Sequence, residues 1–135
     1  MLYNSTWMKP RQEAGPAVIA WEGNSKEVLS TFPDEVKATL GFSLRQIQNG
    51  RLPVCDHRPL PSVGTGVWEL KEGDSRTWYR VMYLARIQNV VHVLHCFEKD
   101  SRKTDRRDIQ TARSRLSNAL QRIKERKGPH GEVTE

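Results

Sequence analysis

The pattern of apolar and polar residues changes several times in the first half of the chain, and each change predicts an element. Val18–Trp21 is a short apolar run typical of a buried strand. Ser25 then suits the N-cap of a short helix over 26–32, which Pro33 ends before a second helix begins. That second helix follows from apolar residues at helical spacing, and Gly50 marks its end; these residues are Val36, Leu40, Leu44 and Ile47.

Strand-forming patterns dominate the middle of the chain. Residues 51–65 contain three prolines and predict an ordered loop, because proline fits neither a helix interior nor a central strand. Three β-rich segments follow at 67–71, 77–86 and 90–97, separated by turn sequences at 72–75 and 88–89. They predict an antiparallel meander, and the odd spacing of Leu94 and Phe97 allows a β-bulge in its third strand.

After residue 101 the pattern becomes helical again. A helix from Thr104 to Lys127 carries one apolar stripe made of Ile109, Ala112, Leu116, Ala119, Leu120 and Ile123. The order β-α-α-β-β-β-α keeps strands apart from helices, so we expect an α+β fold, a small antiparallel sheet with the helices packed on one face. We expect a single domain over residues 17–127, an irregular arm over 1–16 and a flexible tail over 128–135.

Charge is concentrated at one end of this otherwise ordinary composition. The 135 residues include 22 Lys and Arg against 16 Asp and Glu, a net charge of +6. Residues 100–127 hold ten basic and four acidic residues, an excess equal to the whole net charge. Such a segment attracts nucleic acid or an acidic protein partner, or it is simply a solvated helix face.

The same composition bears on where the protein is found. No apolar run approaches the roughly 20 residues that span a bilayer, and the first eleven residues lack the apolar region of a signal peptide. Cys55 and Cys96 are too few for a disulfide framework. We therefore expect a soluble cytoplasmic protein that does not associate with membranes.

Candidate chemistry gathers on the sheet face that the helices are expected to leave open. Strand alternation places Glu69 and Lys71 on that face, and Arg80 beside Lys71 on the next strand. The orientation of His95 and Lys99 is not fixed, because a bulge in their strand would reverse it. Each of these residues taken singly fits an ordinary solvated or packing role. Basic side chains expected near this face, Lys71, Arg76, Arg80, Lys99 and Lys103, together favour a phosphate-binding surface.

Other catalytic and metal chemistries find little support. Cys55, Asp56 and His57 are consecutive, but no second Cys/His pair has the spacing of a zinc site. The chain contains no phosphate-binding P-loop, no dinucleotide-binding glycine pattern and no Gly-x-Ser-x-Gly nucleophile sequence. We therefore expect no metal and no cofactor.

Three segments, residues 59–71, 79–83 and 93–99, together resemble the phage-related, HigB-like branch of the RelE/ParE toxin superfamily. The resemblance spans residues 17–120 and implies a RelE-like fold and the role of toxin in a type II toxin–antitoxin module. Most toxins of the RelE and HigB branches enter the ribosomal A site and cleave mRNA without a metal, which inhibits translation. It further implies a cognate antitoxin, often a helix-turn-helix protein such as the HigA-like ones, that neutralises the toxin.

Particular roles follow from the resemblance. Arg80 matches the phosphate-stabilising arginine, and Lys71 and Lys99 match contacts to the phosphate or the leaving group. Either Glu69 or His95 would act as general base, since both carry groups able to accept the 2′-hydroxyl proton. The expected RNA contacts at the periphery are Arg76, Arg102, Lys103 and Arg106.

One departure and two other functions stay open. Many relatives carry a second basic residue where Glu98 stands, so Lys99 and Lys103 compete for one role. The superfamily also includes ParE-like toxins, which inhibit DNA gyrase by binding and need no general base. A phage-derived basic protein with neither activity is the third reading, because fold alone does not determine function.

Overall fold

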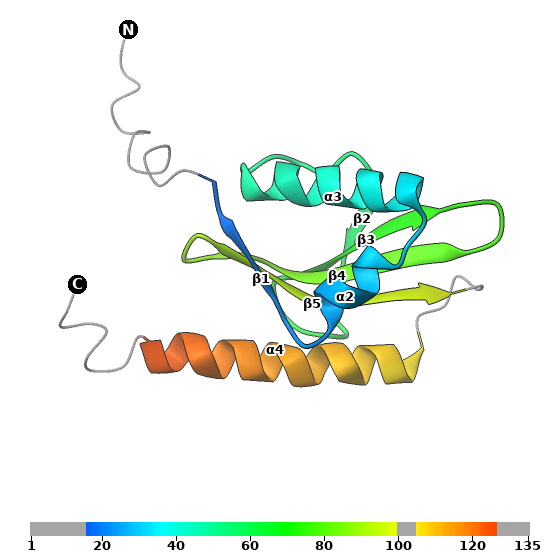
Figure 1. Ribbon diagram of the computed structural model, residues 1–135. Coiled ribbons are helices and arrows are strands. Elements are labelled where there is room, and N and C mark those ends of the chain that lie inside the picture. The colour runs from blue at the N-terminus through cyan, green and yellow to red at the C-terminus, as the bar shows by residue number, and fades with distance from the viewer. Residues whose placement is uncertain (1–15, 100–104, 127–135) are drawn as a thin grey trace, which may run out of the picture.

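A computed structural model describes residues 16–99 and 105–126 of the chain. Five strands and three helices make up this part (Figure 1). In chain order they are β1 (Val18–Trp21), α2 (Ser25–Ser30), α3 (Asp34–Gln48), β2 (Asp56–Pro59), β3 (Val67–Gly73), β4 (Trp78–Ile87), β5 (Val90–Lys99) and α4 (Arg106–Arg126). The predicted arm over 1–16, apart from Pro16, and the predicted tail lie outside the described residues.

The strands form one mixed sheet in the order β1-β5-β4-β3-β2. The predicted meander is confirmed, because β3, β4 and β5 pair antiparallel. The expectation of a purely antiparallel sheet is wrong at one edge, where β1 pairs parallel to β5. The other edge holds β2, a strand inside the segment that the prolines predicted to be loop. Pro59 is tolerated there because an edge strand has one side without ladder hydrogen bonds.

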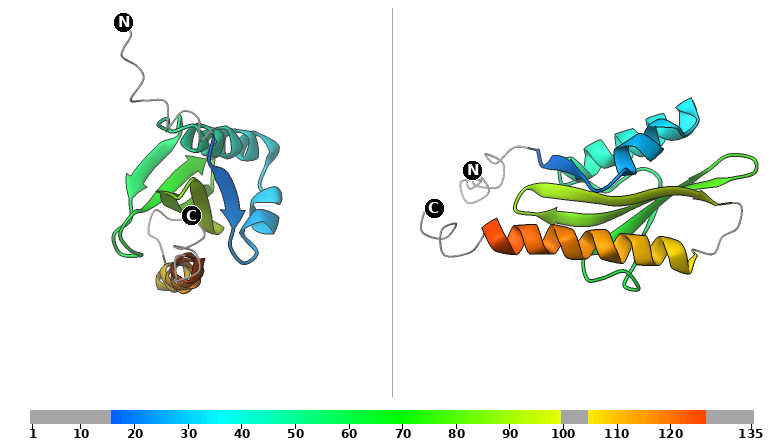
Figure 2. Two further views of the ribbon diagram at one scale, coloured as in Figure 1. Left: turned by 90° about the vertical axis from the view of Figure 1, so that its left-hand side faces the viewer. Right: turned by 60° about the horizontal axis from the view of Figure 1, so that its bottom comes forward.

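Helices cover both faces of the sheet, which corrects the prediction that they share one face. Helix α3 lies on one side and α4 on the other (Figures 1 and 2). The α3 face buries one apolar cluster, which includes Leu40, Val81 and Val93. The α4 face buries a second cluster, with Met82 and Leu116 among its members. Apolar strand residues on both faces need cover, so neither face of the sheet is fully open.

A β-bulge sets which way the end of β5 faces. Met82 pairs with His95 and Tyr83 pairs with Val93, so Leu94 is an extra residue in β5. The bulge that residue spacing allowed is therefore confirmed, and it turns Leu94 into the cluster under α4. The tight turn before β5 also matches the sequence, because Gln88 and Asn89 both have positive φ angles of 53° and 65°.

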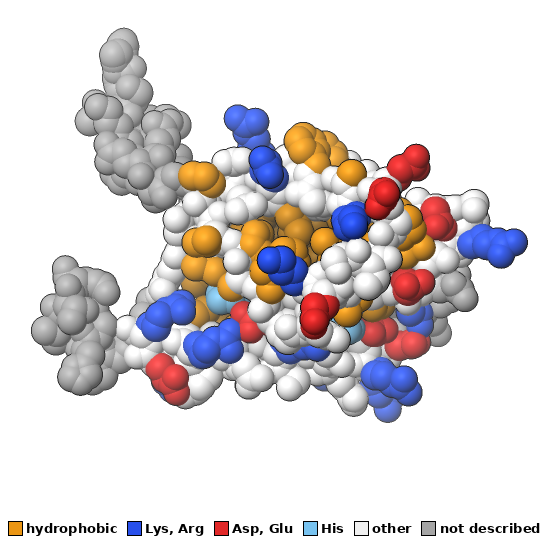
Figure 3. Space-filling view, in the orientation of Figure 1, with side chains coloured by type: hydrophobic (Ala, Val, Ile, Leu, Met, Phe, Trp, Pro, Cys, Tyr) orange, Lys and Arg blue, Asp and Glu red, His pale blue; other side chains and the backbone are white. Residues whose placement is uncertain are grey.

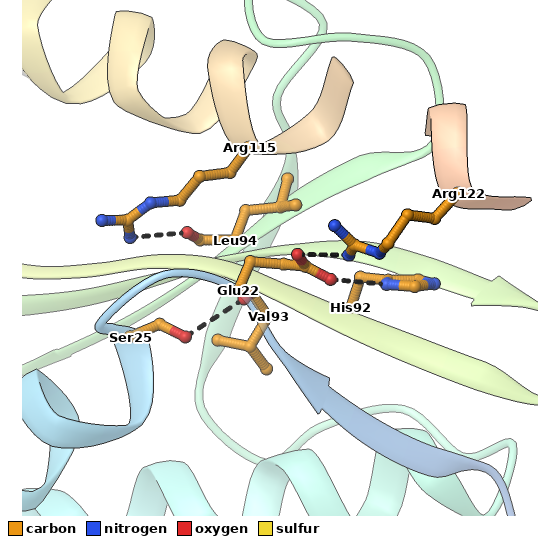
Figure 4. A network of polar contacts seen from close by, with 7 residues as sticks. All are labelled: Glu22, Ser25, His92, Val93, Leu94, Arg115 and Arg122. Atoms are coloured by element: carbon orange, nitrogen blue, oxygen red, sulfur yellow. Dashed lines mark hydrogen bonds and ion pairs between the residues drawn. The ribbon is translucent and has the colours of Figure 1, made fainter. Parts of the chain in front are cut away.

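Polar contacts fasten α4 to the sheet (Figure 4). Buried Glu22 bonds His92 of β5 at 2.9 Å and Arg122 of α4 at 2.5 Å. Arg115 donates to the backbone carbonyl of Leu94 at 3.0 Å.

Within the described ranges, no helix is both long enough and apolar enough to cross a bilayer.

The short helix α2 begins differently from the prediction. Ser25 lies inside the helix, and the N-cap residue is Asn24, which makes no side-chain capping bond. The Ser25 hydroxyl instead donates to the carbonyl of Val93 at 3.2 Å (Figure 4). Ser25 therefore ties α2 to the central strands rather than stabilising the helix end.

Candidate functional site

A pocket opens on the α4 face of the sheet, where β2 and β3 lie beyond the cover of α4. It has a volume of about 230 Å³ and is lined by Asp56, His57, Arg58, Glu69 and Lys71. The strand register explains how these residues meet, because Lys71 lies directly between Asp56 of β2 and Arg80 of β4. We call Arg58, Glu69, Lys71 and Arg80 the cationic cluster, since three of its four members carry positive charge.

Glu69 holds two of the arginines. Its Oε1 accepts hydrogen bonds from Arg58 Nε at 3.1 Å and from Arg80 Nη1 at 3.4 Å. Glu69 and Arg80 are only 1% and 0% exposed, whereas the Arg58 side chain is 55% exposed. A buried carboxylate is stable only when it is paired, so the two guanidinium groups and Glu69 depend on one another. The second carboxylate oxygen, Oε2, has no hydrogen-bond partner within residues 16–99 and 105–126.

Lys71 is positioned by an aromatic ring. Its Nζ lies 4.8 Å from the centroid of the Trp78 ring, a distance typical of a cation–π contact. The absence of a side chain at Gly73 makes room for that ring, since a Cβ there would lie 2.7 Å from it. The half-buried Lys71 side chain therefore lies at the pocket, and Lys71 is the cross-strand partner of Arg80.

The arrangement suits a phosphate group. Arg80 is fully buried on the α4 face of the sheet, while Arg58 and Lys71 line the pocket and reach solvent. Guanidinium and ammonium groups fixed in this way stabilise negative charge that develops on a phosphoryl group. Among the residues that the structure describes, no group of three or more His, Cys, Asp and Glu side chains is placed to hold a metal ion.

Arg80 needs a partial correction. The alternation of β4 predicted it on the same face as Glu69 and Lys71, and the register agrees. The expectation that it points outward to solvent is wrong, because the side chain is fully buried. The cause is that apolar neighbours on this face, such as Met82 and Phe97, bring α4 down over the sheet.

His95 bonds to α4 and Lys99 bonds to the residue just before α4, and neither joins the pocket lining. His95 Nε2 lies 2.8 Å from Asp108 Oδ1, and its ring stacks on Phe97 with centroids 5.0 Å apart. Burial lowers the pKa of His95, although the hydrogen bond to Asp108 opposes that shift. Lys99 pairs with Asp105 at 2.6 Å and so lowers the pKa of that carboxyl group.

The expected peripheral contacts are scattered. Arg76 is exposed in the turn between β3 and β4, where its backbone N–H donates to Asp74 Oδ1 at 2.9 Å. This bond and a similar one from Thr77 lower the pKa of Asp74. Arg106 is exposed in the first turn of α4, and Figure 3 shows other basic side chains along that helix. Arg102 and Lys103 lie outside the described residues.

Sequence reasoning missed Arg58 and Asp56. Both lie on β2, and the prolines at 53, 59 and 61 concealed this strand. Residues 56–58 are all polar, so they lack the alternation of apolar and polar residues that predicts a strand. Recognising that strand would have placed Arg58 opposite Glu69.

Comparison with known proteins adds family information. The family model described as Phage derived protein Gp49-like (DUF891) matches residues 27–117, roughly two thirds of the 135-residue chain. No curated protein matches the chain. The matched span contains every member of the cationic cluster.

Proposed function

Since the chain belongs to the Gp49-like phage-derived family, a RelE/ParE-type toxin family of toxin–antitoxin systems, we propose that it is the toxin of such a module. We propose further that it cleaves mRNA on the ribosome, that it does so without a metal, and that an antitoxin holds it inactive. The observation that carries the proposal is the cationic cluster, in which Arg58, Lys71 and Arg80 surround Glu69 at an open pocket.

Cleavage of RNA by its own 2′-hydroxyl requires three events, and the cluster supplies a group for each. Glu69 accepts the proton of the 2′-hydroxyl as the bond from that oxygen to phosphorus forms. Arg58 stabilises the negative charge that develops on the phosphoryl oxygens, and the buried Arg80 holds the Glu69 carboxylate in place. The bond from phosphorus to the 5′-oxygen then breaks, and Lys71 protonates the leaving oxygen. The products are a 2′,3′-cyclic phosphate and a 5′-hydroxyl.

The pocket favours Glu69 over His95 as the general base. Glu69 lines the pocket, whereas His95 does not and is bonded to Asp108 of α4. The register separates the two residues by Met82, which pairs with Glu69 on one side and His95 on the other. With neighbouring strands about 4.8 Å apart, Glu69 and His95 lie about 10 Å from each other along the sheet.

A test distinguishes this function from gyrase inhibition. The chain is expressed briefly in bacteria, cellular RNA is sequenced from its new 5′ ends, and a reporter records the SOS response to DNA damage. We expect cleaved transcripts bearing 5′-hydroxyls and no early SOS response. The Lys71→Met variant should lose cleavage, while the exposed Lys26→Met variant on α2 makes the same charge change far from the pocket. An SOS response with intact mRNA would instead establish a ParE-like binding inhibitor.

A further inference from the structure

A second hollow lies on the opposite face of the sheet from the cationic cluster. Its volume is about 210 Å³, and Ile47 at the end of α3, Trp68 of β3 and Tyr83 of β4 contribute its apolar walls. These three residues belong to or pack against the core cluster on the α3 face. Leu52, in the loop before β2, completes the rim. We call this the apolar hollow.

Exposed apolar side chains lie at the apolar hollow and in the loop that contributes to its lining. Leu52 is 77% exposed, and Val54 in the same loop is 59% exposed. Large apolar side chains beside an apolar depression are typical of a protein interaction site, because a partner removes both from water together. A volume of this size accommodates a single large side chain, the kind of anchor that dominates many interfaces.

Charge around the apolar hollow indicates what accompanies that anchor. Arg51 is among the residues that line it, and none of the described lining residues is acidic. On the opposite face of the sheet, the pocket of the cationic cluster adds Arg58 and Lys71. A partner segment that reaches both hollows is therefore favoured when it carries a carboxylate.

The two hollows meet at the edge of the sheet. His57 of β2 lines both the apolar hollow and the pocket of the cationic cluster. Strand β2 is the last in the sheet order, so no further strand of the described chain blocks a path around it. Packed layers are about 10 Å apart, so side chains reach about half that distance from each face of a sheet, and the two hollows lie about 10 Å apart across β2. An extended chain advances about 3.3 Å per residue and covers that distance in roughly three residues.

We propose that the apolar hollow is the docking site of a protein segment with an aromatic or leucine anchor and an Asp or Glu about three residues away. The anchor fills the hollow, the segment crosses β2, and the carboxylate pairs with Arg58 and Lys71 where RNA phosphate would bind. This proposal rests on the proposed function, since it describes how a neutralising partner recognises and blocks that same site.

The test selects random dodecapeptides from a display library on the full-length chain. We expect selected peptides to be enriched in a large apolar residue with an acid about three positions away. Their dissociation constants should rise about tenfold or more on Leu52→Asp. Val18→Asp, at the opposite edge of the sheet and 60% exposed, is the matched control and should leave affinity unchanged. The same peptides should inhibit RNA cleavage, and Arg58→Met should weaken their binding.

Several results would overturn the docking site. These are the absence of such enrichment, or peptides that bind Leu52→Asp as tightly as the unaltered chain. A loss of oligoribonucleotide binding confined to Leu52→Asp would also overturn it, because the hollow would then be an RNA site. A change of oligomeric state confined to Leu52→Asp would overturn it as well. Peptide binding is measured without RNA, so its failure is separable from failure of the proposed function. Binding that depends on Leu52 in a chain without RNA cleavage would overturn the function alone.

Discussion

Replacing Arg80 by Met tests whether the buried ion pair holds the cationic cluster together. The substitution keeps the side-chain volume but leaves the Glu69 carboxylate, 1% exposed, without its fully buried partner. At the observed 3.4 Å, with an effective dielectric constant near 20, the attraction is about 5 kcal/mol. Arg58 remains 3.1 Å away but is half-exposed, so it compensates only in part. We expect the free energy of unfolding to fall by about 3 kcal/mol.

Urea denaturation followed by circular dichroism measures this change, because chains of this size commonly unfold in one cooperative transition. The matched variant is Glu69→Leu combined with Arg80→Met, which removes both charges and should be more stable than Arg80→Met alone. Lys26→Met on the surface of α2 should change stability by no more than about 0.5 kcal/mol. The reasoning is refuted if Arg80→Met unfolds within about 1 kcal/mol of the unaltered chain, or if the double variant is no more stable than the single one.

Three further predictions concern the rest of the fold. Burial lowers the pKa of His95, so its contribution to stability is complete above the unfolded pKa of about 6.5 and is lost as pH falls through the folded pKa. His95→Phe should remove this part of the acid sensitivity when urea unfolding is measured across pH. Curves of stability against pH that run parallel for the variant and the unaltered chain would contradict it. Gly64→Ala should cost about 1 kcal/mol or more, because the new Cβ would lie 2.5 Å from Leu116 Cδ2 in the core; an unchanged unfolding midpoint would show that the core yields there. Burial raises the pKa of Cys55 and takes that of Cys96 to about 12, so both thiols should react with Ellman's reagent only on unfolding, and rapid labelling of the native chain would count against the packing around them.

The local pattern was enough to predict the meander and the face shared by three members of the cluster. Alternation along β3 and β4 set Glu69, Lys71 and Arg80 on one side, because side chains on a strand alternate with a period of two. The turn between these strands then placed Lys71 opposite Arg80. These relations depend only on residues near one another in the sequence.

The rest depends on long-range packing, which short windows of sequence do not contain. The apolar stripe of α4 was visible, but the face of the sheet that it covers is decided by contacts with residues such as Met82 and Leu94. That choice buries Arg80 and brings His95 against Asp108. Strand β2 forms through pairing with β3 despite its prolines, so Arg58 could not be placed from local propensity.

The most direct test of the cationic cluster is a single-turnover rate of mRNA cleavage on purified ribosomes. The rate is compared between the unaltered chain, Lys71→Met, Arg58→Met and the distant Lys26→Met, after circular dichroism has shown that all four are folded. We predict a loss of about 10²–10³-fold for Lys71→Met, a smaller loss for the half-exposed Arg58→Met, and no change for Lys26→Met. Cleavage by Lys71→Met within about twofold of the unaltered rate would contradict the role of this pocket.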